Sequence, residues 1–525
     1  MDRSDPHILT TFKHKINSSL LTDEMGYKKF LPNKELDAFI PKPTIQKVCH
    51  INCDTFSKSI KIICLLGSFG KLDENTSTWL DKSRLEDKDL PVTDKQRLDG
   101  FRDLVANGWF GDTERRSFEE DQWLFLSPTF GSTEGINLTK HHPLPITYCH
   151  KTEWRGSFGS IYQIKIHPAH LNIDPELQKG DDPMFALKEL ISDNDKDFKR
   201  EREGLHKMLS LQHEHLIQVI DSFKRDTAFY FIFPWANGGD LWNLWNKPEW
   251  DEQRRENEMI LWVLKQIKGI ASGVKELHHP PTSQDSSSQA SQSTTEGPEY
   301  HAHHCDLKPK NILIFFDESK GIFRGTLRIA DAGLVKFHQQ ITTKRQVGTS
   351  MAMIATIDYA PPEALEEVQG SKRSRKFDMW SLGCIFLEFI TWVLGGSGEI
   401  KTFRDGRQSS YPTGFPFYQT VERTISGNKY KVHSQVKHYM RKIGAHHCCP
   451  TTWFQDLLEI IKKDLLVINQ GDRIDSKTLD DKLQVILEKA EDGSYLSAGF
   501  MPGKLPRVSK PKYWVKSLMS SSTNQ

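Results

Sequence analysis

Residues 304–314, with the sequence His-Cys-Asp-Leu-Lys-Pro-Lys-Asn-Ile-Leu-Ile, place a carboxylate, an ammonium group and a carboxamide in one short segment. Asp306, Lys308 and Asn311 lead directly into an apolar run that is typical of a β-strand. A carboxylate can orient an attacking hydroxyl, a lysine can bind a moving phosphoryl group, and an asparagine can hold a metal ion. The segment therefore predicts a phosphoryl-transfer loop, and a solvated turn is the alternative interpretation.

A glycine-containing segment at 154–162, Trp-Arg-Gly-Ser-Phe-Gly-Ser-Ile-Tyr, opens the part of the chain with β-like texture. Glycines let the backbone of a hairpin lie close to phosphates. We expect this hairpin to contact a nucleotide, with an isoleucine covering the adenine face. The residues concerned are Gly156, Ser157, Phe158, Gly159 and Ile161.

An apolar run at 185–187 ends in Lys188, which can pair with the α- and β-phosphates of a nucleotide. Within that run, Ala186 is a further nucleotide-binding candidate. Glu201 follows thirteen residues after the lysine, in a helical pattern over 198–211, and is the expected ion-pair partner. Glu203 is the alternative partner on another helix face, and a solvated helix face would explain either glutamate.

The segment 231–241, Phe-Ile-Phe-Pro-Trp-Ala-Asn-Gly-Gly-Asp-Leu, predicts a strand, a Gly-Gly turn and the start of a helix, as in a hinge between two lobes. Backbone groups at 234–236 are expected to bind adenine, with a phenylalanine behind it. The candidate nucleotide-binding residues are Phe233, Trp235, Ala236 and Asp240, together with Leu313 from the loop.

Asp331 follows a strand-like run twenty-five residues beyond the aspartate of the loop, and small residues come after it. A carboxylate in that position can reach a Mg²⁺ ion that bridges two phosphates. The segments 356–363 and 378–383 then predict a substrate-facing segment and the start of an apolar helix. Arg473 comes late enough in the chain to be a buried partner for Glu363.

The composition limits the classes of function. The chain has 525 residues, 29 Phe, 13 Trp and a net charge of +1, so several packed domains are possible and no attraction to nucleic acid or membrane is expected. The most apolar run, 379–394, contains Glu388 and predicts a buried helix. No signal peptide is recognised, which favours the cytoplasm or nucleus. The eight cysteines and the sequence His-His-Cys-Cys at 446–449 show no zinc-site spacing.

The sequence pattern changes near residue 144, from helical spacing of apolar residues to short strand-like runs. We expect a mainly helical module of unknown role over 1–144, with a helix capped by Thr93; it is either a plain support or a module that binds a regulatory partner. Strands at 160–166, 185–190 and 229–233 and a long amphipathic helix at 260–278 predict an α+β domain over 145–490. Residues 280–299 predict a disordered insert, and 491–525 a flexible tail.

These motifs, in this order, resemble the eukaryotic protein kinase family. The resemblance is carried by 304–311, 331–333, 356–363 and 378–383, and the lysine after Asp-Leu resembles the serine/threonine branch. The layout is similar to the kinase-like proteins of filamentous ascomycete fungi. The resemblance implies a bilobal fold, with a small β-rich N-lobe and a larger helical C-lobe, and a transferase that takes ATP, Mg²⁺ and a protein substrate.

The resemblance also implies a role for each matching residue. Asp306 would be the catalytic base, and Lys308 would contact the γ-phosphate. Asn311 and Asp331 would bind Mg²⁺, Lys188 and Glu201 would form the activating ion pair, and Asp378 would anchor the catalytic loop.

Four positions depart from the family pattern. Trp154 stands at the usual first glycine, and Cys305 replaces the arginine before the catalytic aspartate, so an activation-loop phosphate would lack its main partner. Lys310 replaces a glutamate, which changes the expected peptide preference, and Ala332 replaces a phenylalanine. Trp154, Cys305 and Ala332 support the alternative hypothesis of a pseudokinase or nucleotide-binding scaffold. None of them removes a group that touches phosphate or metal.

Overall fold

In the computed structural model of the chain, the described residues are 6–26, 28–33, 42–106, 108–131, 135–156, 159–173, 182–191, 211–248, 256–280, 303–316, 325–331, 358–365, 374–410, 413–424, 427–445, 453–491 and 495–496. The chain divides into two compact units. The first comprises residues 1–241 and 276–353, and the second comprises residues 242–275 and 354–525.

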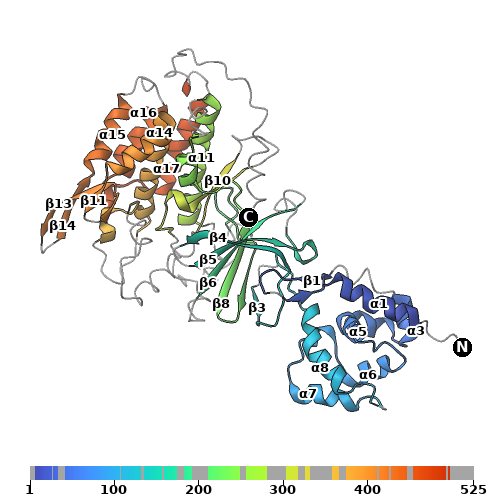
Figure 1. The fold of residues 1–525 in the computed structure, drawn as a ribbon. Helices are drawn as coiled ribbons and strands as arrows, with labels where there is room; N and C mark the ends of the chain where they lie inside the picture. The colour runs from blue at the N-terminus through green and yellow to red at the C-terminus, as the bar shows by residue number, and fades with distance from the viewer. Residues whose placement is uncertain are drawn as a thin grey trace, which may run out of the picture. The chain divides into compact units, whose positions relative to one another are not determined.

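The first unit begins with short helices and one small hairpin (Figure 1). Their bounds are α1 Pro6–Ser19, β1 Leu21–Thr22, β2 Lys29–Phe30, α3 Lys42–Val48, α4 Cys53–Lys58, α5 Ile60–Ser68, α6 Asn75–Ser83, α7 Lys95–Gly100 and α8 Asp112–Asp121, with 3-10 turns at Asp87–Asp89, Phe101–Asp103 and Gln122–Phe125. The expected cap at Thr93 is wrong by one residue. The Asp94 carboxylate caps α7 by accepting hydrogen bonds from the backbone N–H groups of Gln96 and Arg97.

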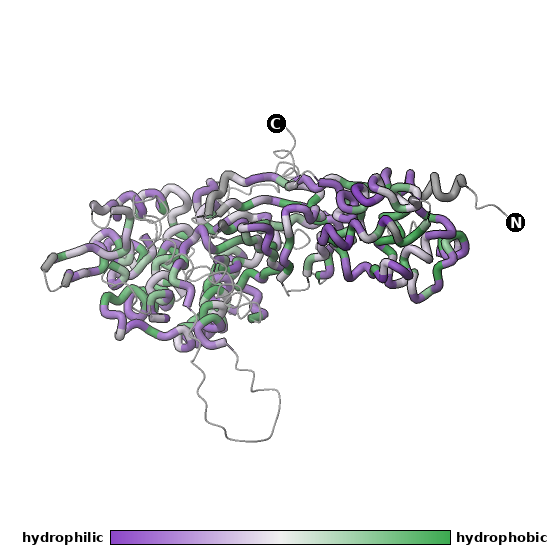
Figure 2. Tube along the Cα trace, turned by 90° about the horizontal axis from the view of Figure 1, so that it is seen from below, coloured by the Kyte–Doolittle hydropathy of each residue, from purple (hydrophilic) through white to green (hydrophobic). Residues whose placement is uncertain are grey.

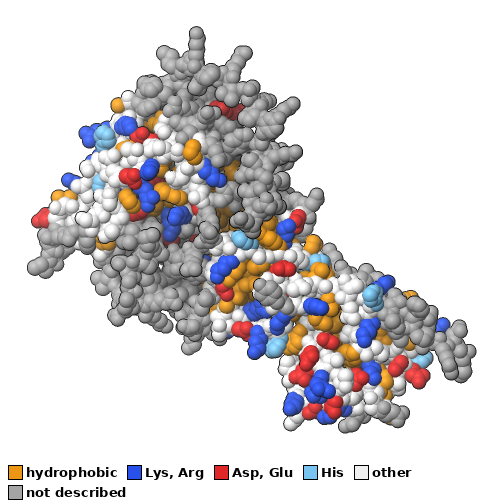
Figure 3. All heavy atoms as spheres, in the orientation of Figure 1, with side chains coloured by type: hydrophobic (Ala, Val, Ile, Leu, Met, Phe, Trp, Pro, Cys, Tyr) orange, Lys and Arg blue, Asp and Glu red, His pale blue; other side chains and the backbone are white. Residues whose placement is uncertain are grey.

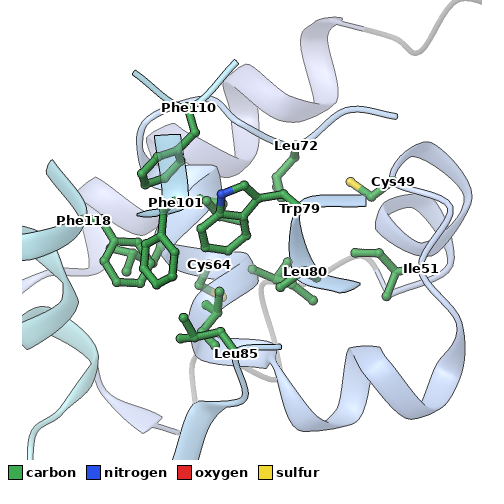
Figure 4. Close-up of a cluster of buried hydrophobic side chains, with 14 of the residues drawn as sticks. Cys49, Ile51, Cys64, Leu72, Trp79, Leu80, Leu85, Phe101, Phe110 and Phe118 are labelled. Atoms are coloured by element: carbon green, nitrogen blue, oxygen red, sulfur yellow. The ribbon is translucent and has the colours of Figure 1, made fainter. Parts of the chain in front are cut away.

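Aromatic side chains hold these helices together around Trp79 of α6, which is fully buried (Figure 4). The ring of Phe110 stacks on Trp79 with centroids 5.1 Å apart, and Phe101 meets Trp79 edge-on at 5.2 Å. Phe118 of α8 completes the cluster at 6.1 Å from Trp79. Each such pair contributes about 0.5–1.5 kcal/mol beyond its buried area. This packing stabilises helices that are too short to be stable alone.

A six-stranded sheet follows, with the strand order β3-β7-β8-β6-β5-β4. Its strands are β3 Ile136–Leu138, β4 Ile146–Gly156, β5 Gly159–Ile166, β6 Phe185–Ile191, β7 Asp221–Arg225 and β8 Ala228–Pro234. All neighbouring strands are antiparallel except β3 and β7, which pair in parallel at one edge. The strands predicted at 160–166, 185–190 and 229–233 are confirmed as β5, β6 and β8.

One face of this sheet is covered by residues that precede it in the chain. The ring of Phe130 lies 5.3 Å from that of Phe223 on β7. Met25 from the hairpin β1–β2 packs against the same apolar core, which also contains Leu187 of β6. The N-terminal segment therefore supplies part of the core of the sheet.

The hairpin β1–β2 fastens the helical module to the sheet. Asp23, in the turn of the hairpin, is fully buried, and its carboxylate accepts a hydrogen bond from the backbone N–H of Leu144 at 3.0 Å. Burial raises the pKa of Asp23, and the hydrogen bonds that it accepts partly oppose this shift. The backbone N–H of Glu24 donates to the carbonyl of Ile146 on β4 at 3.0 Å.

His170 makes a second connection between the module and the sheet, at the end of the 3-10 turn Pro168–His170. Its imidazole is fully buried: Nδ1–H donates to the Pro128 carbonyl at 2.8 Å, and Nε2 accepts from the backbone N–H of Asn33 at 3.2 Å. The ring of Phe30 packs edge-on against it at 5.7 Å. Burial lowers the pKa of His170 to about 4, so this imidazole is neutral near pH 7.

The first unit ends in a short hairpin of β9 Ile312–Phe315 and β10 Thr326–Ile329, preceded by the 3-10 turn Pro309–Asn311. Backbone hydrogen bonds join β10 to the segment before β7: the Ile329 N–H donates to the His215 carbonyl at 2.8 Å, and the Ile217 N–H donates to the Ile329 carbonyl at 2.9 Å. The hairpin is thereby held on the same framework as the sheet.

The second unit is built around α14, Lys376–Asp405, which bends at Gly396, where φ is +74°. In the part of the chain that the structure describes, α14 is the one helix long and apolar enough to cross a membrane. All of its apolar window is buried inside the protein. The prediction of a buried helix over 379–394 is therefore confirmed.

Amphipathic helices and two small hairpins complete the second unit. The elements are α10 Leu241–Asn246, α11 Asn257–His278, α15 Ser434–Gly444, α16 Trp453–Ile460, a π-helical turn Ile461–Leu465, α17 Ser476–Ala490, β11 Ser409–Ser410, β12 Thr413–Gly414, β13 Tyr418–Thr424 and β14 Gly427–Val432; Leu241 and the end of α11 belong to the first unit. The helix predicted at 260–278 is confirmed as α11. Polar and apolar stretches alternate along the chain in Figure 2, as expected for helices that bury one face.

Candidate active site

Asp306, Lys308 and Asn311 converge within the first unit. Nζ of Lys308 lies 2.8 Å from Oδ2 and 3.1 Å from Oδ1 of Asp306. Nδ2 of Asn311 donates to the carbonyl oxygen of Asp306 at 2.9 Å and to its Oδ2 at 3.0 Å. These donors hold the carboxylate in one orientation, which a general base requires.

The backbone around the loop is held by His304, which is fully buried. Its Nε2–H donates to the carbonyl of Ala330 at 2.9 Å, and its Nδ1 accepts the backbone N–H of Asp306 at 3.2 Å. Cys305 between them has φ of +57° and is 1% exposed. A left-handed conformation costs a non-glycine residue about 1–2 kcal/mol, so the surrounding contacts must stabilise this turn.

Lys188 on β6 meets Asp331 just after β10. The Lys188 Nζ lies 2.7 Å from Oδ1 of Asp331, and the lysine is 4% exposed. Asp331 has φ of +63° and follows Ala330, whose N–H donates to the carbonyl of Asn311 at 2.8 Å. The carboxylate is therefore held beside the catalytic loop. Glu201, the expected partner of Lys188, lies outside the described residues, so that ion pair stays a prediction.

The register of the sheet places four of the predicted nucleotide-binding residues on one face. Ile161 of β5 lies opposite Lys188, and Ala186 lies opposite Phe233 of β8. Directly opposed residues and residues two apart share one face of a sheet. Gly156 and Gly159 pair at the end of the β4–β5 hairpin. The face that carries the lysine is therefore lined by small and apolar side chains, which suits a nucleotide base.

The segment after β8 corrects one expectation. The backbone N–H of Trp235 donates to the carbonyl of Met184 at 3.2 Å, so it is not available to adenine. The carbonyl of Ala236 accepts the N–H of Gly239 at 3.1 Å. In the described part of the chain, the N–H of Ala236 makes no hydrogen bond, which leaves it as the donor best suited to a nucleotide base.

Two hydrogen bonds that were not predicted from the sequence join the segment after β8 to the residue that follows β9. The side chain of Asn237 donates from Nδ2 to the carbonyl of Phe316 at 3.2 Å, and its Oδ1 accepts the Phe316 N–H at 2.8 Å. Asp240, which is 1% exposed, bridges to Leu313 through the backbone. A β-carbon at Gly238 would lie 2.7 Å from Ile314, so only glycine allows this approach.

The oxygen donors fit a magnesium ion. Asn311 uses its amide nitrogen toward Asp306, which leaves its Oδ1 oriented as an acceptor, and the Asp331 carboxylate lies beside the same loop. Mg²⁺ prefers carboxylate and amide oxygens, and takes its remaining ligands from phosphates and water. These two residues could hold such an ion together with the phosphates of a nucleotide.

In the second unit, the expected ion pair of Arg473 and Glu363 is confirmed. Nη1 and Nη2 of Arg473 bind Oε1 and Oε2 of Glu363 at 2.5 and 2.8 Å, and the arginine is almost fully buried. This two-point geometry fixes the end of the segment 358–365. Asp378, the expected anchor in the first turn of α14, is fully buried.

A buried cluster around Glu388 was missed. The Tyr359 hydroxyl donates to Oε2 of Glu388 at 2.7 Å, and Nη2 of Arg407 donates to its Oε1 at 2.9 Å. The guanidinium lies 4.0 Å from the ring centroids of both Phe403 and Phe417. Burial raises the pKa of Glu388, and the nearby arginine opposes that shift. The presence of a glutamate within an apolar helix could have indicated this cluster, because a buried carboxylate needs a partner.

Several predictions fall on residues that the structure does not describe. They concern Ser157, Phe158, Glu201, the helical pattern over 198–211, Ala332, the sequence at 446–449, most of the insert at 280–299 and nearly all of the tail beyond 491.

Comparison with known proteins decides the family. Residues 175–443 match the model of the protein kinase domain, which is just over half of the chain. The chain belongs to the protein kinase family. The match begins after the glycine hairpin and ends before Arg473. The assignment of these two regions to the kinase pattern therefore depends on the structure and not on this comparison. The narrower likeness to kinase-like proteins of filamentous fungi stays a prediction.

Several individual kinases resemble the chain, with low sequence identity. Serine/threonine-protein kinase AtPK2/AtPK19 of Arabidopsis thaliana is 25% identical over 261 residues, covering 48% of this chain and 43% of that protein. Aurora kinase C of Mus musculus is 24% identical over 277 residues, covering 50% and 78%. Nekl-2 of Caenorhabditis elegans is 28% identical over 191 residues, covering 36% and 44%. The chain thus spans less than half the length of two of these three kinases.

Proposed function

We propose that this protein kinase family member transfers the γ-phosphate of ATP to serine or threonine hydroxyls of protein substrates. The observation that supports this most strongly is the loop in which Lys308 and Asn311 both hydrogen-bond to the carboxylate of Asp306. Lys188 and Asp331 meet at 2.7 Å in the same unit. A base, two phosphate-binding cations and two oxygen ligands for a metal are thus available together.

In the proposed mechanism, Asp306 orients the substrate hydroxyl and accepts its proton as the phosphoryl group moves. Lys308 stabilises the charge on the transferring group, and Lys188 positions the α- and β-phosphates. Mg²⁺ would be held by Asn311 and Asp331, and it supplies neutralisation of the phosphate charge. Lys188 and Asp331 form an ion pair with each other in this structure. When a nucleotide binds, the two side chains would exchange this ion pair for contacts with the nucleotide.

Phosphate transfer from γ-labelled ATP to a generic basic protein, by wild type and by Asp306→Asn, tests the proposal. Loss of a general base typically lowers the rate by about 10²–10⁴-fold, so the variant should be near background. Nucleotide binding, measured as a shift in melting temperature with ATP and Mg²⁺, should persist in the variant. Equal labelling by both proteins, with nucleotide binding intact, would refute the enzyme and favour a nucleotide-binding scaffold.

A further inference from the structure

Positive charge is concentrated on one part of the second unit, formed by the hairpin β13–β14 and helix α15. Residues 418–445 contain six lysines and arginines and one glutamate, a formal net charge of +5, whereas the whole chain has +1. The remainder of the chain is therefore net negative. Figure 3 shows basic and histidine side chains gathered on the surface over α15.

Helix α15 separates this charge from its apolar face. The buried side chains recur at helical spacing and are Val436, Tyr439, Met440 and Ile443. The exposed face carries Lys437, His438, Arg441 and Lys442. The helix contains no aspartate or glutamate, so its solvent-facing side has no acidic partner from its own sequence.

Three cations of this region have no acidic partner among the residues that the structure describes. Lys429 pairs with Glu422 at 2.8 Å, and Lys442 pairs with Glu399. Lys431, Lys437 and Arg441 are exposed and form no ion pair with any residue that the structure describes. These three side chains are called the basic surface below.

Ordinary structural roles explain only part of this arrangement. Cations at the end of a helix interact favourably with its dipole, which accounts for Arg441 and Lys442. Lysines on an edge strand discourage unwanted pairing, which accounts for Lys429 and Lys431. Lys437 lies close to the start of α15, where a cation is unfavourable, and its spacing of four from Arg441 adds repulsion between the two charges. A bound anion would relieve this repulsion.

We propose that the basic surface is a docking site for an acidic segment of a protein substrate. Three features favour a polypeptide over a nucleic acid. In the described part of the chain, β13 and β14 form a sheet of two strands only, so backbone groups along their outer edges can pair with an extended peptide. Val421 is 57% exposed and offers an apolar contact, whereas Tyr418 and Tyr439 are buried and cannot stack on bases.

The test measures binding without catalysis, by fluorescence anisotropy of a labelled, glutamate-rich peptide that contains no serine, threonine or tyrosine. The full chain is compared with the triple variant K431E/K437E/R441E at about 0.1 M salt, where exposed charges still interact over about 10 Å. A matched control, K47E/K95E/K477E, reverses three exposed lysines on α3, α7 and α17. The double variant K437Q/R441Q serves if the triple variant does not fold.

We expect the triple variant to bind the peptide about tenfold or more weakly, because three attractions are replaced by repulsions, and the control variant to change by less than about twofold. Wild-type binding should also weaken strongly at about 1 M salt. An equal loss in the control variant would overturn the proposal. Tighter binding of a single-stranded RNA of equal charge, or no peptide binding by wild type at millimolar peptide, would also overturn it.

The identity of the segment as a substrate rests on the proposed kinase function, and a second measurement separates the two. A serine peptide with an acidic tail should be phosphorylated with a higher kcat/KM than the same peptide with a neutral tail, and the triple variant should remove that advantage. Peptide binding without any phosphate transfer by wild type would confirm the docking site and refute the kinase function.

Discussion

We expect the first unit to lose stability as the pH falls below about 6.5, because His170 cannot take up a proton without breaking a buried hydrogen bond. Its Nε2 accepts the N–H of Asn33, and its Nδ1–H is already used on the carbonyl of Pro128. In the unfolded chain the imidazole titrates near its ordinary pKa of 6.5, whereas in the folded chain the pKa is lowered to about 4. Between these values only the unfolded chain binds the proton, so folding becomes less favourable as the pH falls.

The size of the effect follows from the two pKa values. The difference between these two pKa values corresponds to at most about 3 kcal/mol. Integrated between pH 7.5 and 5.5 the loss is about 1 kcal/mol, and by pH 4.5 it is about 2–3 kcal/mol. The stability from a neutral His170 is fully present above pH 6.5.

The assay is urea unfolding, followed by tryptophan fluorescence, of wild type and His170→Asn at pH 7.5, 5.5 and 4.5. An asparagine keeps a donor for the carbonyl of Pro128 but cannot be protonated. The variant should be less stable than wild type at pH 7.5 and should lose about 2–3 kcal/mol less on acidification. Other titrating groups cancel in this comparison because both proteins contain them.

Parallel stability–pH curves for wild type and His170→Asn would refute this reasoning. So would an NMR titration in which the ring signal of His170 in the folded chain has a midpoint near 6.5. Either result would mean that the imidazole is more accessible to solvent, or less tightly held by Asn33, than the structure shows.

Three further substitutions have definite expected outcomes. Arg407→Met should lower the melting temperature of the second unit by about 6–20 °C, because Glu388 would remain buried without its partner at a cost of about 3–5 kcal/mol. Lys310→Glu should shift the preference among peptides with charged residues beside the acceptor toward basic ones, by about 2–30-fold in kcat/KM. Asn237→Ala should lower the unfolding free energy by about 1–3 kcal/mol in urea titrations, since two hydrogen bonds to the backbone of Phe316 are lost.

Each of these has a matched control. Replacing Glu388 by glutamine together with Arg407→Met should restore much of the lost stability, and a double variant no better than the single one would contradict the ion-pair argument. Lys95→Glu makes the same change of charge at a lysine far from Lys310 in the sequence, and it should leave the peptide preference unchanged. Asn237→Asp keeps the acceptor and should lose about half as much stability as alanine; equal losses would show that the donor alone matters.

The elements predicted from local pattern are the ones that the structure reproduces. Strands β5, β6 and β8 follow from short runs of apolar and β-branched residues, and α11 follows from apolar residues at helical spacing. The groups of the catalytic loop lie within six residues, so their convergence needs only a local turn. Local sequence determines these features, because the interactions that fix them connect near neighbours.

Features that depend on distant partners were not predicted. The pairing of β3 with β7 joins segments separated by about 85 residues, and nothing in the sequence of β3 identifies its partner. The hydrogen bond from the Trp235 N–H to the Met184 carbonyl depends on the path of the backbone at the ends of β6 and β8. The partner of Glu388 could be sought from the burial of its helix, but the choice of Arg407 among many arginines is made by tertiary packing.

The parallel pair β3–β7 and the buried Asp23 have a consequence for how the chain is made. Asp23 leaves the ribosome about 120 residues before Leu144, whose N–H it binds, and β3 leaves about 85 residues before β7. At about 5–20 residues per second, the nascent N-terminal segment waits about 6–24 s for Leu144, and β3 waits about 4–17 s for its partner strand. During that interval Met25 and Phe130 have no sheet to cover, and Ile136 has no partner strand. Slow translation over residues 145–225 would lengthen the period in which a chaperone can bind them.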